Sequence, residues 1–515
     1  MLIMEVDVLI VGAGPTGLTL ACDLARRNVS HRLIEAMDGP VRGSRGKGVQ
    51  PRSLEVFDDL GIVDAVIAGG RFNLPMIFHD AGPGVMPPNR TGPNHRPDAP
   101  YATTLLTPQW HVEASLRARL VELGGEVEYA TKLLDFEQDG DIVIARVEIE
   151  GRGTDIRARW LVGCDGGRSA VRRCLGVPFL GETHEDIRMW VGDVQVTGLD
   201  RECWHVWPSP AAFLALCPLP GTDRFQFQAA IPATETREPS TEAFQNLVWA
   251  RTGRDDIRLS DAEWLSLWRA NVRMVDHMRI GRVFLAGDAA HVHSPAGGQG
   301  MNTGIQDAVN LGWKLAAVLD GADESLLDTY DEERLPVAAN VLGLSSELTK
   351  KAFTKEMKAT DTTLQLGVNY RDRNLSIDWQ RPTNKLRAGD RAPDAPGLSS
   401  AEGTVRLFDL LRGLHASVLT FGIDPSDEGR DLIDRYGGDV AYIRIDRQGA
   451  ASNGSWIDTE GHAFRHYAPQ DDTLMVIRPD GYVGLMTSAR TCEGLSTYLQ
   501  RIFGLSRRNC EKLRN

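Results

Sequence analysis

The 515-residue sequence has few cysteines and no long apolar segment. Its seven cysteines are odd in number, scattered and without a CxxC pair, which argues against a disulfide framework or a zinc site and suits a reducing compartment. No apolar run approaches the roughly 20 residues needed to span a bilayer. The first residues lack the basic region and cleavage site of a signal peptide. These absences predict a cytoplasmic protein without a membrane partner.

An excess of basic residues is also missing. Lys plus Arg number 57 against 70 for Asp plus Glu, a net charge of −13. A field of this sign repels nucleic acid, so we expect no nucleic-acid partner. The 42% hydrophobic and 25% charged residues are ordinary values for folded domains. The chain is too long for one hydrophobic core, so two to four domains are expected.

The N-terminal segment has the pattern of a βαβ unit. Residues 6–11 form a β-branched run typical of a buried parallel strand, and 16–27 have apolar residues at helical spacing. Residues 32–34 predict a second strand. Free N–H groups at the start of the helix would attract a phosphate.

The turn between this strand and helix carries a dinucleotide fingerprint. Gly12 allows a tight turn, Gly14 permits close approach of a pyrophosphate, and Gly17 allows helix–strand packing. Glu35 ends the second strand, where its carboxylate can accept hydrogen bonds from an adenosine ribose. An acid there suits FAD or NAD and disfavours a 2′-phosphate. The predicted cofactor-binding residues of this unit are Gly12, Gly14, Pro15, Thr16, Gly17 and Glu35.

Two further motifs follow apolar runs. In Gly287-Asp288-Ala289-Ala290-His291, Asp288 ends a strand and can hold a ribityl hydroxyl. Residues 295–302 then bring backbone N–H groups toward an anionic ring or phosphate at a helix start. Asp165 begins an Asp-Gly-Gly turn, a pattern that by itself marks a turn more often than a site. His291 and His293 form an HxH pair without a suitably spaced third ligand, so no metal is predicted.

Together, the three motifs resemble those of the group A flavoprotein monooxygenases, the single-component aromatic hydroxylases of the phenol- and para-hydroxybenzoate-hydroxylase type. The resemblance covers roughly residues 5–345, and each motif serves a different part of FAD. Residues 406–411 and 478–483 resemble the C-terminal thioredoxin-like domain of one branch. That branch contains phenol hydroxylase, rifampicin monooxygenase and polyketide hydroxylases, and its C-terminal domain usually lacks redox cysteines.

The resemblance implies an α/β FAD-binding domain of para-hydroxybenzoate-hydroxylase type, an inserted mixed-sheet substrate domain and a thioredoxin-like α/β domain without CxxC. The expected bounds are 1–75, 105–180 and 276–345 for the FAD-binding domain; 76–104 and 181–275 for the substrate domain; 346–385 for a helical connector and linker; and 386–515 for the C-terminal domain. Local patterns also predict an irregular segment at 75–100, a helix near 263–269 and a linker at 381–403.

The resemblance also assigns roles to particular residues. Arg45 and Gln109 should touch FAD, and Arg45 should affect flavin reduction or positioning. Asp165 is linked to both FAD and nicotinamide binding, and Asp288 to the ribityl and pyrophosphate region. The residues implied to line the isoalloxazine include Pro295, Gly298, Gly300, Met301 and Asn302.

The implied reaction uses NADPH or NADH as a transient co-substrate and O₂ to hydroxylate a phenolic or polycyclic, polyketide-like substrate through a flavin C4a-hydroperoxide. No second glycine fingerprint exists for NAD(P)H, which argues against reductases with two dinucleotide domains. Two alternatives stay open: Baeyer–Villiger-type or decarboxylating oxygenation of a polyketide, and FAD and drug binding without turnover. Either a monomer or a homodimer is compatible with the sequence.

Aromatic residues of the middle region are candidate substrate contacts. Alternating aromatics on a sheet usually pack a core, which is the competing interpretation for each of them. The candidates are Trp204, Trp207, Phe213, Phe225 and Phe227. His205 is the candidate for proton handling, since a base that deprotonates a phenol would raise the nucleophilicity of its ring.

Overall fold

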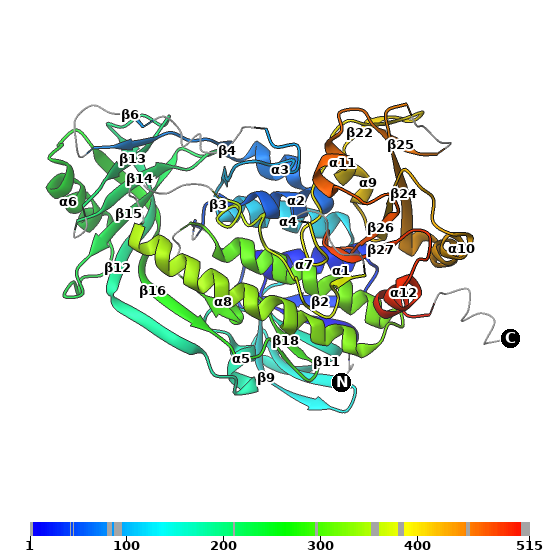
Figure 1. Cartoon of the computed structure of the whole chain (residues 1–515). Coiled ribbons are helices and arrows are strands. Elements are labelled where there is room, and N and C mark those ends of the chain that lie inside the picture. The colour runs from blue at the N-terminus through cyan, green and yellow to red at the C-terminus, as the bar shows by residue number, and fades with distance from the viewer. Residues whose placement is uncertain are drawn as a thin grey trace.

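The computed structural model describes residues 4–41, 43–44, 46–79, 85–86, 95–209, 212–293, 297–351, 360–379, 386–449 and 454–505. These residues form three large mixed sheets, each with its own covering helices. The second sheet lies at one end of the molecule and the third at the other, with the long helices α7 (Gly300–Leu319) and α8 (Asp328–Lys351) between them (Figure 1). No helix in the described part of the chain is long and apolar enough to cross a bilayer.

The first sheet contains the predicted βαβ unit. Its main path runs β17-β18-β11-β1-β2-β8, and β1 pairs in parallel with both β11 and β2. The strands are β1 (Met4–Val11), β2 (His31–Ile34), β8 (Val127–Glu128), β9 (Thr131–Asp139), β10 (Ile142–Ile149), β11 (Arg152–Gly163), β17 (Arg279–Ile280) and β18 (Val283–Leu285). Helix α1 (Pro15–Arg26) packs against α7 and α4 (Gln109–Glu122). The predicted elements at 6–11, 16–27 and 32–34 are confirmed.

The second sheet is built around two long antiparallel strands. Its order is β19-β16-β12-β15-β14-β13-β5-β6. The strands are β5 (Met76–Phe78), β6 (Val85–Met86), β12 (Leu180–Thr197), β13 (Trp204–Trp207), β14 (Leu214–Pro218), β15 (Arg224–Ile231), β16 (Arg258–Met274) and β19 (His291–Val292). Helix α6 (Thr241–Thr252) packs on one face, where apolar residues of successive strands form a core. On the opposite face, Ser44 and Lys47 contact Asp193 of β12 and Gln226 of β15.

Three local predictions in and beyond this region are wrong. Residues 263–269 form part of strand β16 and not a helix, because β12 supplies a ladder along most of the segment and tertiary pairing overrides local preference. Within the expected irregular segment at 75–100, strand β5 pairs in parallel with β13 and antiparallel with β6, while residues 80–84 and 87–94 lie outside the described residues. Residues 398–403, the end of the expected linker, belong to the hairpin of β21 (Leu398–Ser400) and β22 (Gly403–Val405).

The third sheet belongs to the C-terminal part of the chain. Its order is β20-β27-β26-β23-β24-β25-β21-β22, with β23 parallel to β24 and antiparallel to β26. Besides the hairpin, it contains β20 (Ile377–Asp378), β23 (Ala416–Phe421), β24 (Val440–Arg447), β25 (Trp456–Asp458), β26 (Thr473–Ile477) and β27 (Val483–Ser488). Its helices are α9 (Leu407–Leu411), α10 (Asp427–Tyr436), α11 (His462–Tyr467) and α12 (Leu495–Phe503).

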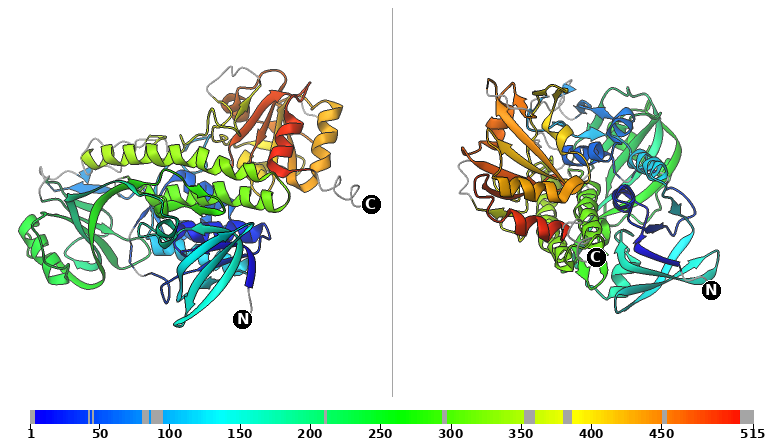
Figure 2. Two further views of the ribbon diagram at one scale, coloured as in Figure 1. Left: turned by 90° about the horizontal axis from the view of Figure 1, so that it is seen from below. Right: turned by 90° about the vertical axis from the view of Figure 1, so that its right-hand side faces the viewer.

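The remaining short elements connect these units. They are the three-stranded sheet of β3 (Gly48–Val49), β4 (Arg71–Phe72) and β7 (Leu105–Leu106), with α2 (Pro51–Asp59), α3 (Val63–Ala68) and α5 (Ala170–Leu175). Figure 2 shows α7 and α8 running side by side from the second sheet toward the third.

A buried ionic cluster joins the third sheet to these long helices. Arg478, from the C-terminal part, places its guanidinium 2.6 Å from Glu333 Oε1 on α8. Lys314 Nζ on α7 lies 2.8 Å from Glu333 Oε2, and all three side chains are fully buried. Because an unpaired charge is costly in such surroundings, the cluster fixes how the third sheet docks.

Candidate cofactor and substrate site

The three sequence motifs converge at one place in the fold. A Cβ added at Gly12 would lie 2.5 Å from the carbonyl oxygen of Cys164, the residue before Asp165. A Cβ at Gly287 would lie 2.5 Å from Oγ1 of Thr16 in the fingerprint turn. The fingerprint therefore touches both other motifs through close backbone approaches that a larger residue would prevent.

The fingerprint glycines differ in what surrounds them. Gly12 has a φ of +105°, and a Cβ at Gly17 would lie 2.0 Å from the Gly12 carbonyl oxygen. Both glycines are thus required by the protein's own packing. A Cβ at Gly14 would meet no protein atom within 4 Å, and no side chain caps the start of α1 there. This open, uncapped helix N-terminus fits a pyrophosphate.

Glu35 is held at the edge of this turn. Its Oε2 accepts a hydrogen bond of 2.8 Å from the Ala13 N–H, and its Oε1 accepts one of 3.0 Å from the Met37 N–H. The carboxylate is therefore fixed beside the glycines, where a ribose attached to the pyrophosphate would reach it.

Asp165 organises the Asp-Gly turn. Its Oδ2 accepts hydrogen bonds from the N–H groups of Ala170, at 2.6 Å, and Val171, at 3.2 Å, at the start of α5. Burial raises the pKa of this carboxyl, although hydrogen bonds to its charged form oppose the shift. The local role of Asp165 is to hold the turn that packs on Gly12.

Asp307 anchors the Gly-Asp motif and was not identified from the sequence. Its Oδ2 accepts a hydrogen bond of 3.0 Å from the Gly287 N–H and lies 2.8 Å from His291 Nε2. Its Oδ1 accepts a hydrogen bond of 2.6 Å from Arg334 Nε. Burial tends to raise the pKa of Asp307, but Arg334 and His291 lower it to about 2. The sequence signal for this role is an aspartate among the apolar residues of the segment that forms α7.

This anchoring leaves Asp288 exposed beside the start of α7. Its Oδ1 is 3.9 Å from the position of a Cβ on Gly300. No side chain caps α7, so Asp288 and the helix N-terminus form a polar edge close to the fingerprint turn. His291 is buried and engaged with Asp307, which gives this histidine a structural role.

Buried amides hold the loop that precedes α7. Asn302 Oδ1 accepts a hydrogen bond of 2.8 Å from the Gln50 N–H, while its Nδ2 donates to the carbonyls of Gly48 and Gly298. Gln50 Nε2 donates to the Gly297 carbonyl at 2.9 Å. The structure thus ties residues 297–302, including Gly298, Gly300, Met301 and Asn302, to strand β3. Pro295 lies outside the described residues.

The residue Gly46, which precedes β3, contacts the start of α4. Gln109, the first residue of α4, donates its backbone N–H to the Gly46 carbonyl at 2.9 Å, and its side chain donates to Glu113 at 2.9 Å. The predicted neighbour Arg45 lies outside the described residues. Gln109 is therefore brought to the loop that also carries Arg45 in the sequence.

The second sheet separates the five candidate aromatics onto two faces. Phe225, Phe227 and Trp207 belong to the core under α6, where the Phe227 ring stacks on Phe244 with centroids 4.0 Å apart. Trp204 and Phe213 belong to a separate apolar cluster with Phe78, Val206 and Ala215 on the opposite face. The structure therefore brings only Trp204 and Phe213 to the face that meets the loop at 43–47.

His205 points away from that face. It alternates with Trp204 along β13, is 2% exposed, and stacks with His79 and Trp207. Its Nδ1 lies 3.2 Å from His79 Nε2, and its Nε2 lies 3.1 Å from the Asp200 carbonyl oxygen. Burial lowers the pKa of His205. Both ring nitrogens are engaged, so we do not retain His205 as a proton-handling residue.

Polar residues that were not predicted from the sequence lie on the Trp204 face of the second sheet. Lys47 Nζ lies 2.5 Å from Gln226 Oε1 and 3.2 Å from Gln228 Oε1, and sits 4.3 Å above the Trp204 ring. Asp193 Oδ2 accepts a hydrogen bond of 2.7 Å from the Ser44 N–H. The alternation of phenylalanine and glutamine along β15 was the signal for this polar face.

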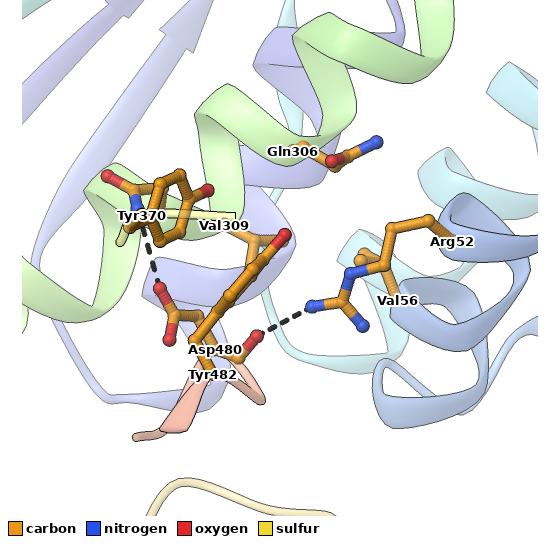
Figure 3. A pocket seen from close by; sticks show the side chains of 8 residues that line it. Arg52, Val56, Gln306, Val309, Tyr370, Asp480 and Tyr482 are labelled. Atoms are coloured by element: carbon orange, nitrogen blue, oxygen red, sulfur yellow. Dashed lines mark hydrogen bonds between the residues drawn. The ribbon is translucent and has the colours of Figure 1, made fainter. Parts of the chain in front are cut away.

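A small pocket lies elsewhere in the described part of the chain. It opens between the third sheet and helices α2 and α7, and its lining includes Arg52, Gln306, Tyr370 and Tyr482 (Figure 3). Arg52 donates a hydrogen bond of 2.6 Å to the Asp480 carbonyl oxygen across it. None of its lining residues is among those predicted to bind cofactor or substrate.

Comparison with known proteins gives consistent results. Residues 5–345 match the family model described as FAD binding domain, and 385–506 match that described as aromatic-ring hydroxylase, C-terminal. The chain is 43% identical to a flavin-dependent monooxygenase of Mycobacteroides abscessus over 96% of this chain and 99% of that relative. It is 33% identical to a rifampicin monooxygenase of Streptomyces venezuelae over 93% of this chain and 94% of that relative. The structure of aklavinone-11 hydroxylase with FAD and aklavinone matches with a TM-score of 0.84 and 26% identity, and the match covers 98% of this chain and 100% of that structure.

Proposed function

Since this chain belongs to the FAD-dependent aromatic-ring hydroxylases, we propose that it uses NADPH or NADH and O₂ to hydroxylate a phenolic or polycyclic, polyketide-like substrate. The convergence of three motifs around the open Gly14 position is the single observation that carries the proposal. When bound, FAD would supply the redox chemistry, accepting electrons from the nicotinamide and passing them to O₂.

The residues present fit the cofactor. The open helix start at Gly14 and the fixed carboxylate of Glu35 suit the pyrophosphate and ribose of its ADP half. We propose that Asp288 holds the ribityl region, and that the loop at 297–302 lines the isoalloxazine with its amide-fixed backbone. Arg45 and Gln109 would contact FAD from the loop and from α4.

The Trp204 face of the second sheet is the proposed substrate surface. Trp204 and Phe213 provide aromatic area, while Lys47, Gln226 and Gln228 provide polar groups that orient a hydroxylated ring. The rigid sheet would hold the substrate against the loop at 297–302 and exclude water from the reacting atoms.

We propose the discontinuous domain bounds given above, because strands of the first sheet come from residues 4–34, 127–163 and 279–285. A thioredoxin-like C-terminal domain is supported by the parallel β23–β24 pair flanked by antiparallel β26 and β27. Arg478 and Glu333 would fix its docking, with no redox chemistry of its own.

The test is the oxidation of NADPH and NADH by the FAD-loaded protein, with and without a panel of phenols and polycyclic aromatics. Stimulated oxidation with a product hydroxylated on a ring carbon, located by NMR, supports the proposal. A product with oxygen inserted into a ring would instead indicate Baeyer–Villiger chemistry. Bound flavin without any stimulated oxidation across the panel would favour a binding protein.

A further inference from the structure

Lys47 is unusual in this chain because of both its type and its place. Only nine of the 57 basic residues are lysines, so arginine is the ordinary cation here. Unlike arginine, a lysine can lose its proton when it is buried and act as a base. Lys47 lies between the loop at 297–302 and the second sheet. The carbonyl of the adjoining Gly48 accepts a hydrogen bond of 2.9 Å from Asn302, and Lys47 itself contacts Gln226 of β15.

The partners of the Lys47 amine are neutral. Among the described residues, no carboxylate lies within ion-pair distance of its Nζ; the contacts are two amide oxygens and the Trp204 ring. The strand register pairs Gln226 with Asp193 and Gln228 with Val191 of β12, so these side chains share one face of the second sheet. A neutral amine that donates two hydrogens to the amide oxygens keeps its lone pair available as an acceptor.

The ionisable groups around Lys47 support a neutral amine. Burial lowers the pKa of Lys47, which Cys217 on β14 and Asp193 on β12 only partly oppose. Burial also raises the pKa of Asp193, despite its hydrogen bonds from Ser44, and raises the pKa of Cys217 to about 11. Each of these groups is thus shifted toward its uncharged form before a ligand arrives.

We propose that Lys47 is the catalytic base that receives the proton of the substrate's phenolic or enolic oxygen, an inference that rests on the proposed function. The O–H bond breaks, the proton moves to Lys47 Nζ, and the electron pair stays on the oxygen. The resulting ammonium faces the phenolate, and Gln226 and Gln228 hold it in place. The ionised ring is a better nucleophile, so ionisable phenols and enols are the preferred substrate class.

The test compares K47M and K47R with K132M, a control that removes one exposed lysine from β9 of the first sheet. The substrate is the phenol turned over fastest by the wild-type protein. We expect K47M to lower kcat/KM at pH 7 about a hundredfold, with the deficit shrinking as pH rises and the free phenol ionises by itself. K132M should keep the wild-type profile, and K47R should bind phenolate without restoring the wild-type pH dependence.

A second measurement does not depend on turnover. The absorbance difference spectrum of the bound phenol reports its ionisation, and its apparent pKa should be lower by about one or more in wild type than in K47M. Equal spectra and equal pH profiles in K47M and wild type would overturn the role of Lys47 while leaving the hydroxylase intact. No turnover of any phenol by wild type would overturn both. If K47M does not retain FAD, K47Q replaces it in the same comparison.

Discussion

The carboxylate of Asp307 accepts the backbone N–H of Gly287 at 3.0 Å and thereby fixes the turn that presents Asp288. The same carboxylate is paired with Arg334 and His291, all buried. The motif visible in the sequence is therefore positioned by an ionic network outside it. Such an arrangement is preorganised, since the turn has its shape before a cofactor arrives.

Replacing Asp307 by Asn should destabilise the protein and reduce FAD retention. The variant leaves Arg334 buried without its carboxylate, a loss of about 3–5 kcal/mol in unfolding free energy. The pKa of Asp307 is depressed to about 2 from 3.8, so its stabilisation is present above about pH 4 and is lost as pH falls toward 2. Denaturant unfolding across this range should therefore show a smaller pH slope in D307N. A wild-type slope in D307N would contradict the assignment.

Two glycine substitutions separate cofactor binding from folding. G14A adds a Cβ where no protein atom lies within 4 Å, so the apoprotein's unfolding free energy should change by no more than about 0.5 kcal/mol. The methyl occupies the space predicted for the pyrophosphate, so the FAD dissociation constant should rise at least tenfold. G17A instead places a Cβ 2.0 Å from the Gly12 carbonyl and should destabilise the apoprotein itself. FAD titration and unfolding of both variants check this, and tight FAD binding by G14A would refute the placement.

The two faces of the second sheet predict different outcomes for two aromatic residues. F227A opens a cavity in the core under α6 and should cost about 3–5 kcal/mol of stability. W204F, on the Lys47 face, should change the substrate dissociation constant with little change in stability. Thermal unfolding and substrate titration of each variant distinguish these effects. A binding defect seen in F227A and not in W204F would place the substrate on the face under α6, and would contradict the proposed substrate surface.

Local features of the site could be predicted from the sequence, and distant ones could not. Gly12, Gly14, Gly17 and Glu35 are close along the chain, and each meets a requirement of one βαβ turn. The partnership of Lys47 with Gln226 spans 179 residues and exists only in the folded chain. The period of two along β15 showed which side chains share a face, but it could not show which face meets the cofactor.

The prediction of a helix at 263–269 was wrong because it, too, depended on a contact between distant parts of the chain. The segment contains Trp264 and Trp268 at a spacing that fits a helix turn as well as a strand face. Its pairing partner, β12, lies some 70 residues earlier and aligns Trp264 with Asp193 and Trp268 with Met189. Long-range pairing thus decided between two patterns that the local sequence left nearly equal.

The proposed hydroxylase activity is tested by turnover under ¹⁸O₂ with the FAD-loaded wild-type protein, NADPH or NADH, and the panel of phenols and polycyclic aromatics. We expect that a substrate stimulates coenzyme oxidation and yields a product carrying one ¹⁸O atom on a ring carbon. A product whose new oxygen comes from water, or a panel that binds without stimulating any coenzyme oxidation, would contradict it.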